Sequence, residues 1–383
     1  MWDYSSKQRK YGVLHMRRRE SLANAIILVI LFFALFMSSL AANPFIGLLR
    51  SQEEPIFRRF LCRSFCDSSV DKSFAPQAWK NFSKDPNPQS PPSLLLLSLD
   101  WTRPKDPPMS LGHASLLANL HYHNVNAIPG SWAVNSPNFS PQQVTDFIMS
   151  RSNAGVDVAL GVFVWNERAI QSILNDLKRY KFPGRIILGG PQVSYVKKGL
   201  EAFYPQADVF IRGYAEDALV KLVQMKQYDP VSPIKGVHYT GLPDLATTAM
   251  VDLESIPSPF LTGLISPQPF IRWETQRGCP FRCSFCQHRE PNVTMKRRQF
   301  SLSRIMQEVE WIANNPIIQD IAVLDPTFNS CPNYLAIMDK LISERFSGKI
   351  SLQCRIEMVT EDFLNKIGLA PRNRTGGLRK FSL

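Results

Sequence analysis

A chain of 383 residues with 44% hydrophobic and 11% aromatic residues is typical of globular folding, and its length predicts roughly two to three domains. The net charge is +12, and the basic residues are concentrated near the two ends of the chain. We therefore do not expect a nucleic-acid partner. The short basic run Lys296–Arg298 is either a solvated loop or a contact for an anionic ligand or RNA. The seven cysteines do not form a secreted disulfide framework.

The N-terminal segment, residues 1–49, contains no charged residue from Ser21 to Leu49. An apolar helix at about residues 22–42 would be long enough to span about 30 Å of hydrocarbon. Arg17–Arg19 before it favours a cytoplasmic N-terminus. We therefore expect a membrane-associated protein with a single N-terminal span. The alternatives are a cleaved signal with Ser38–Ala42 near the cut, or a targeting or non-native extension of a cytoplasmic or organellar enzyme.

Residues 50–92 are rich in proline, serine and charge, which indicates a linker. From 93 to 228, strand-like apolar runs alternate with helical spacings, including a helix expected at Tyr195–Phe203. This alternation predicts a doubly wound, Rossmann-like α/β domain with a parallel sheet. Ligands bind at the carboxyl ends of such strands, where Gly189, Gly190 and Gly213 fall. These glycines either let a ligand approach the backbone or form tight turns.

The segment 229–269, with Ile256–Phe260 as a stiff extended turn, is expected to be a connector. A last domain at 270–368 shows three strand–helix units, and residues 369–383 form a tail. The first strand of this domain delivers a loop that is rich in cysteine.

That loop holds Cys279, Cys283 and Cys286 in a C-x3-C-x2-C spacing with an aromatic before the last cysteine. Three such thiolates can bind three corners of a cubic [4Fe–4S] cluster and leave one iron open. The alternatives are three unrelated thiols, or a zinc site with His288 as a fourth ligand.

Residues 279–286 resemble the cluster motif of the radical SAM enzymes. The resemblance implies that the open iron chelates the amino and carboxylate groups of S-adenosylmethionine, which an electron then cleaves to a 5′-deoxyadenosyl radical. It also implies that Gly278 shapes the loop, that Phe285 packs near the adenine, and that flavodoxin or ferredoxin donates the electron.

The preceding α/β unit resembles the cobalamin-binding-type domain of the B12-dependent subgroup, through Gly189–Pro191 and Arg212–Glu216. Ala215 stands where that subgroup often has a second glycine, and no Asp-x-His-x-x-Gly run offers an axial histidine. Cobalamin is therefore a further expected cofactor whose binding stays open. His113 and His121 are expected to be surface or core residues.

Asp325–Asn329 after the second strand of the last domain resembles the family's acidic-plus-aromatic signature. The resemblance implies that Asp325 contacts the amino group of S-adenosylmethionine; the alternative is an Asp that caps a turn. Arg355 and Glu357 resemble an Arg-x-Asp/Glu pattern or form a plain ion pair. The family's partial barrel has more units than the three here, so we expect a truncated form, a fragment or a chain that needs a partner.

These observations predict a radical SAM protein whose reaction is methyl transfer to an unactivated carbon or a related radical rearrangement. The substrate, a small molecule or a macromolecule, is not specified, and no residue is assigned a catalytic role. The alternatives are a non-catalytic membrane-anchored remnant or regulator, and a zinc or RNA-binding module.

Overall fold

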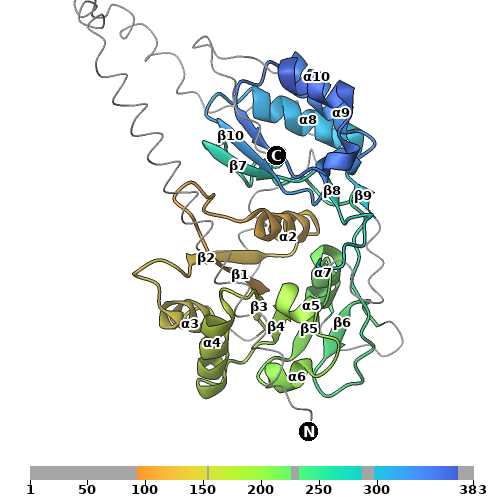
Figure 1. The fold of residues 1–383 in the computed structure, drawn as a ribbon. Coiled ribbons are helices and arrows are strands. Elements are labelled where there is room, and N and C mark those ends of the chain that lie inside the picture. Colours follow the sequence, from red (N-terminus) through yellow and green to blue (C-terminus); the bar gives the residue numbers. More distant parts are fainter. Residues whose placement is uncertain (1–92, 153–154, 226–232, 287–296, 370–383) are drawn as a thin grey trace, which may run out of the picture. The chain divides into compact units, whose positions relative to one another are not determined.

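The computed structural model describes residues 93–152, 155–225, 233–286 and 297–369 (Figure 1). The N-terminal helix predicted at 22–42 and the linker at 50–92 lie outside these residues, so membrane attachment stays a prediction. Across the described ranges, no helix is both long enough and apolar enough to cross a bilayer.

The first sheet has six strands in the order β2-β1-β3-β4-β5-β6. Strands β1 to β5 are parallel, and β6 pairs antiparallel with β5. The strands are β1 (Leu94–Asp100), β2 (Ala127–Ala133), β3 (Asp157–Gly161), β4 (Ile186–Gly189), β5 (Val209–Ile211) and β6 (Val237–Tyr239). The predicted parallel α/β sheet is confirmed, and its order is that of a flavodoxin-like doubly wound fold.

Helices cover both faces of the first sheet (Figure 1). Because successive side chains of a strand point to opposite faces, Leu95 and Leu97 of β1 join one core cluster while Leu94 and Leu96 join the other. The first cluster contains helices α3 (Pro141–Met149) and α4 (Glu167–Arg179), and the second contains α2 (Leu111–Tyr122) and α7 (Glu216–Gln224). This two-sided burial explains why β1 begins with four consecutive leucines, Leu94–Leu97.

One local expectation for this part of the chain was wrong. The single helix expected at 195–203 is replaced by α5 (Pro191–Ser194) and α6 (Leu200–Phe203), because Gly199 with φ of 79° interrupts the helical backbone. The segment 229–269, expected to be a connector, contains β6, whose three residues are too few to show a period.

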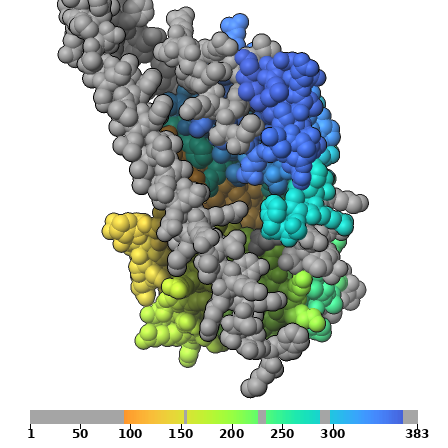
Figure 2. Space-filling model, viewed as in Figure 1, coloured from red at the N-terminus to blue at the C-terminus, as the bar shows by residue number. Residues whose placement is uncertain are grey.

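The second sheet has three parallel strands in the order β11-β10-β7. They are β7 (Phe270–Trp273), β10 (Asp320–Val323) and β11 (Lys349–Ser351). The helices are α8 (Leu302–Ala313), α9 (Tyr334–Ser343) and α10 (Glu361–Leu369). A short antiparallel pair, β8 (Gln276–Arg277) with β9 (Arg298–Gln299), follows β7. In Figure 2, the cyan residues near 300 and the blue C-terminal helices form one continuous surface.

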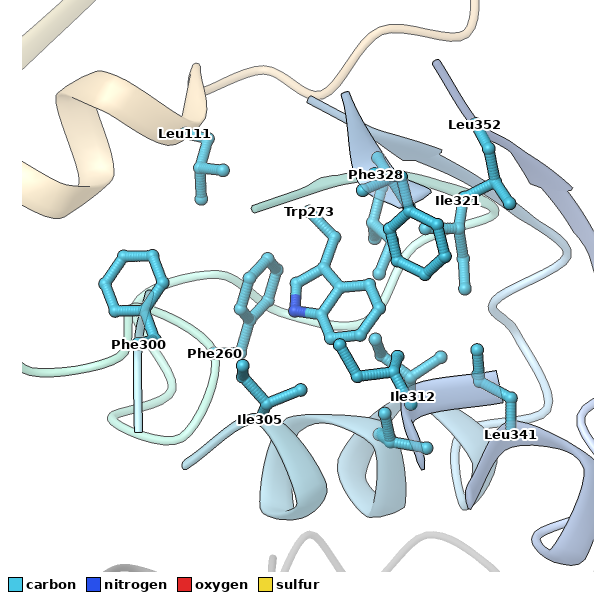
Figure 3. Packing of buried hydrophobic residues seen from close by; sticks show 14 of the residues in the cluster. Leu111, Phe260, Trp273, Phe300, Ile305, Ile312, Ile321, Phe328, Leu341 and Leu352 are labelled. Carbon is cyan, nitrogen blue, oxygen red and sulfur yellow. The ribbon is translucent and has the colours of Figure 1, made fainter. Parts of the chain in front are cut away.

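Trp273 lies at the centre of the core beneath the second sheet (Figure 3). It is 1% exposed, and its indole nitrogen donates a 2.7 Å hydrogen bond to Glu308 of α8. Leu111 and Ala114 of α2 belong to the same core cluster, although α2 also packs on the first sheet. One helix therefore contributes to the cores of both sheets.

Candidate cluster and cofactor site

The cysteine loop begins directly after β8, at the carboxyl end of β7. Gly278 has a φ of 84°, a left-handed conformation that glycine adopts without a steric cost, so it turns the chain into the loop. Cys279, Cys283 and Cys286 are all free thiols and partly exposed. The backbone N–H of Cys286 donates to the carbonyl of Cys283 at 3.1 Å, which closes a tight turn between them.

Polar side chains from the two neighbouring strands reach the sulfurs of this loop. The hydroxyl of Thr327, which follows β10 and Asp325, lies 3.8 Å from the Cys279 sulfur. The Arg355 guanidinium, beyond β11, donates to the Cys283 sulfur at 3.4 Å and covers the Phe281 ring at 4.0 Å. The carboxyl ends of β7, β10 and β11 therefore meet at the cysteine loop, as parallel strands in one sheet require.

The donor set fits an iron–sulfur cluster by its chemistry. Three unpaired thiols share one short loop, and the Arg355 guanidinium places a positive charge beside the Cys283 sulfur. Among the described residues, no three Cys, His, Asp or Glu side chains converge on one metal-binding point. The loop thus presents the ligands without already holding them in a closed cage.

Asp325 is fully buried beneath the loop, with 0% exposure. Its carboxylate accepts hydrogen bonds from the Thr275 N–H at 2.8 Å, the Thr275 hydroxyl at 2.5 Å and the Gln276 N–H at 3.2 Å. Burial raises the pKa of Asp325 to about 7, against the opposing effect of these hydrogen bonds. The side chain fixes the turn that leads into the cysteine loop, and its contact with S-adenosylmethionine stays a prediction.

Two other residues that the sequence analysis singled out, Phe285 and Arg355, lie in or beside the cysteine loop. Phe285 is 92% exposed, so its ring faces solvent, and its packing near an adenine stays a prediction. Arg355 forms an ion pair with Glu357, which is the plainer of the two interpretations of that pattern.

Asn329 is a residue that sequence reasoning did not single out. Its amide donates to the Arg355 carbonyl at 2.8 Å and accepts from the Arg355 N–H at 2.9 Å, so it positions Arg355 near Cys283. Its place in the run that begins at Asp325 was the available signal.

At the first sheet, the predicted glycines have different roles. A Cβ on Gly190 would lie 2.7 Å from the Val162 carbonyl oxygen, and a Cβ on Gly213 would lie 2.5 Å from the Ala249 carbonyl oxygen. Both glycines are therefore required by close backbone packing. A Cβ on Gly189 would make only an ordinary 3.7 Å contact, so the fold alone does not require glycine there.

The strand order of the first sheet reverses between β1 and β3, which is where doubly wound sheets bind ligands. Asn166, 1% exposed, joins these strand ends by donating to the carbonyls of Leu99 and Gly161, each at 2.9 Å. Trp101 is 58% exposed and Trp165 is 43% exposed at the same ends. These aromatics had no sequence signal beyond their position after a strand.

His113 and His121, both on α2, were expected to be surface or core residues, and both are buried. Burial lowers the pKa of His113 to about 4, which keeps the imidazole neutral.

Comparison with known proteins finds a family model and several relatives that match parts of this chain. A family model described as the Radical SAM superfamily matches residues 273–380. Two relatives are each 28% identical over 49% of this chain and 30% of their own length: a 2-(S-pantetheinyl)-carbapenam-3-carboxylate methyltransferase of Streptantibioticus cattleyicolor, and the cobalamin-dependent radical SAM methyltransferase TokK of Streptomyces tokunonensis.

A solved structure with the same fold is the cobalamin-dependent S-adenosylmethionine radical enzyme OxsB, with a TM-score of 0.55 and 16% identity. The match covers 73% of this chain and 41% of OxsB, so the chain spans less than half the length of the proteins it matches. Residues 273–380 of the chain are therefore similar to the radical SAM superfamily, and the proteins that the chain resembles include cobalamin-dependent members of that superfamily.

Proposed function

We propose that this chain binds a [4Fe–4S] cluster through Cys279, Cys283 and Cys286 and acts as a radical SAM enzyme of the methyltransferase type. The observation that carries the proposal is the placement of three free thiols on one loop where three parallel strands end, within the residues that the family model matches. When bound, the cluster would supply an electron for the reductive cleavage of S-adenosylmethionine.

The residues around the thiols have defined tasks in this proposal. Gly278 turns the chain into the loop, the Thr327 hydroxyl contacts the Cys279 sulfur, and Arg355 donates an N–H group to the Cys283 sulfur. Such donors withdraw electron density from sulfur and raise a cluster's reduction potential. The exposed Phe285 leaves an apolar surface for the adenine, and a flavodoxin or ferredoxin is the proposed electron donor.

We further propose that cobalamin binds at the carboxyl edge of the first sheet. The exposed rings of Trp101 and Trp165 offer a flat apolar surface beside the switch point, and the name of one relative includes cobalamin dependence. Methyl transfer is the reaction that the names of two relatives share.

Anaerobic reconstitution with iron and sulfide tests the cluster. We expect about four irons per chain and a brown absorbance, both lost when the three loop cysteines are replaced by alanine. Cys331→Ala is the matched control, because this thiol is 1% exposed in the hydrophobic core and should leave the iron content unchanged. Colourless protein with stoichiometric zinc would overturn the proposal.

Addition of S-adenosylmethionine and a reductant to the reconstituted chain tests catalysis. We expect release of 5′-deoxyadenosine, measured by chromatography, with cobalamin included and omitted. A cluster without this product would favour the non-catalytic alternative.

Gly189→Ala tests the cobalamin site. The substitution adds one methyl group that makes an ordinary contact with the fold, so thermal stability should be unchanged while cobalamin affinity falls. Unchanged affinity would place cobalamin elsewhere or exclude it.

A further inference from the structure

Arg277 is the residue that immediately precedes Gly278 and Cys279, yet its side chain points away from solvent and is 7% exposed. Its guanidinium donates to Glu216 at 2.5 Å, to both carboxylate oxygens of Glu274 at 3.0 and 3.1 Å, and to the Ser115 hydroxyl at 3.4 Å. Glu216 and Ser115 belong to α7 and α2, which pack on the first sheet. The base of the cysteine loop is therefore joined to the unit that contains the first sheet.

Glu216 is the first residue of α7 and follows Gly213 by three positions. It is 5% exposed and also accepts a 3.2 Å hydrogen bond from Ser115. A buried ion pair that loses one partner leaves an uncompensated buried charge, so each member of this pair holds the other in place. The segment between β5 and α7, at the carboxyl edge of the first sheet, is thereby fixed to the cysteine loop.

A second contact strengthens this connection. Arg277 and Arg298 are paired across the β8–β9 hairpin, whose strands are the two stems of the cysteine loop. Both guanidinium groups lie 5.0 Å from the centre of the Tyr214 ring, which belongs to the same β5–α7 segment. The two stems of the loop thus hold one aromatic side chain from the edge of the first sheet by cation–π contacts.

We propose that Arg277 is a positioning residue that couples the two cofactor edges: through Glu216 and Tyr214, occupancy of the first sheet's edge alters the geometry of the cysteine loop, and cluster binding alters the first sheet's edge in return. The inference rests on the proposed function for the identity of the two ligands. The contacts themselves do not depend on it. Reciprocity of the coupling follows from thermodynamic linkage.

Hydrogen–deuterium exchange on the full chain without cofactors tests the contacts. Arg277→Met should speed exchange both in residues 278–286 and in residues 213–218. The matched control is Arg185→Met, which removes another arginine with a carboxylate partner and two backbone carbonyls, all within the first-sheet unit. In Arg185→Met, faster exchange should be confined to the residues around position 185. Acceleration confined to the β8 region in Arg277→Met would overturn the proposal.

Cobalamin titrations of cluster-loaded and cluster-free protein test the coupling. We expect cobalamin to bind the cluster-loaded wild-type chain at least about fivefold more tightly. In Arg277→Met this ratio should fall to about one, and in Glu216→Gln, which keeps the Tyr214 contact, it should fall in part; the double variant should match Arg277→Met, because Glu216 acts through Arg277. Arg277→Lys keeps the charge and should retain part of the ratio. This variant also covers the case in which the methionine variant fails to fold.

The outcomes separate the two claims. A wild-type chain that binds both cofactors independently, or an Arg277→Met chain that keeps the full ratio, would overturn the coupling and leave the proposed function intact. A wild-type chain that binds no cluster or no cobalamin would overturn the proposed function and the coupling with it, while the exchange experiment would still decide whether Arg277 holds the two segments together.

Discussion

At the scale of single residues, Gly190 has a φ of 90° and no room for a side chain, since a Cβ would also approach the Val162 nitrogen to 2.9 Å. We expect Gly190→Ala to lower the free energy of unfolding by about 2 kcal/mol or more, because it combines an unfavourable φ with a backbone clash. Urea denaturation measures this change.

Gly112→Ala is the control for this substitution. Gly112 lies in α2 with no atom within 4 Å of a built Cβ, and alanine has the higher helix propensity, so no loss of stability is expected. Equal losses in the two variants would contradict the explanation.

Asp325 gives a pH dependence whose sign is set by its raised pKa. The folded state keeps the proton up to about pH 7, whereas the unfolded state releases it near the ordinary value of 3.8. Between these values the folded state binds more protons, so the free energy of unfolding contributed by this group falls as pH rises, by up to about 1.4 kcal/mol per pH unit.

Asp325→Asn should remove this slope, because an amide keeps the acceptor for the two N–H groups and can donate to the Thr275 hydroxyl. Urea unfolding of both proteins at several pH values between about 4 and 7 measures the difference. Parallel stability curves for the two proteins would show that Asp325 titrates normally.

At the scale of elements, the carboxyl ends of β1 and β3 depend on Asn166. Its side chain accepts from the Phe163 N–H at 2.8 Å in addition to its two donated hydrogen bonds. Asn166→Ala leaves three backbone groups without these partners and should cost about 2–4 kcal/mol in the free energy of unfolding. Asn175→Ala on α4, where the side chain is exposed, should cost less than about 0.5 kcal/mol. Chemical denaturation of both variants checks the contrast.

At the scale of the whole molecule, the two larger sheets of the described residues share a helix. Leu111 of α2 is buried in the core beneath the second sheet, and the Arg272–Asp106 ion pair at 2.8 Å adds a contact from β7 to the segment after β1. This shared packing predicts that the two sheets unfold together.

Leu111→Asp should split or broaden the calorimetric transition of the wild-type chain, because it places a charge in the shared core. Leu364→Asp on α10 is the control, since Leu364 is 56% exposed and its substitution should leave a single transition. A single sharp transition in Leu111→Asp would show that the shared helix does not link the two sheets.

The sequence by itself determined the elements and motifs that depend on neighbours along the chain. Apolar periodicity located α8 at Leu302–Ala313 and predicted the parallel sheet, and the spacing of three cysteines indicated the family. These signals are local, because helical and strand periods and metal-ligand spacings involve residues that lie close together along the sequence.

Only the tertiary structure decided which distant groups meet. Arg277 pairs with Glu216 and Asp325 binds Thr275, across separations of 61 and 50 residues that no local pattern records. The strands β6, β8 and β9 have two or three residues each, too few to show a period, and they form because their neighbours supply hydrogen-bond partners. Gly190 and Gly213 were recognisable as glycines in turns, but the backbone that packs against each one is brought there by the fold.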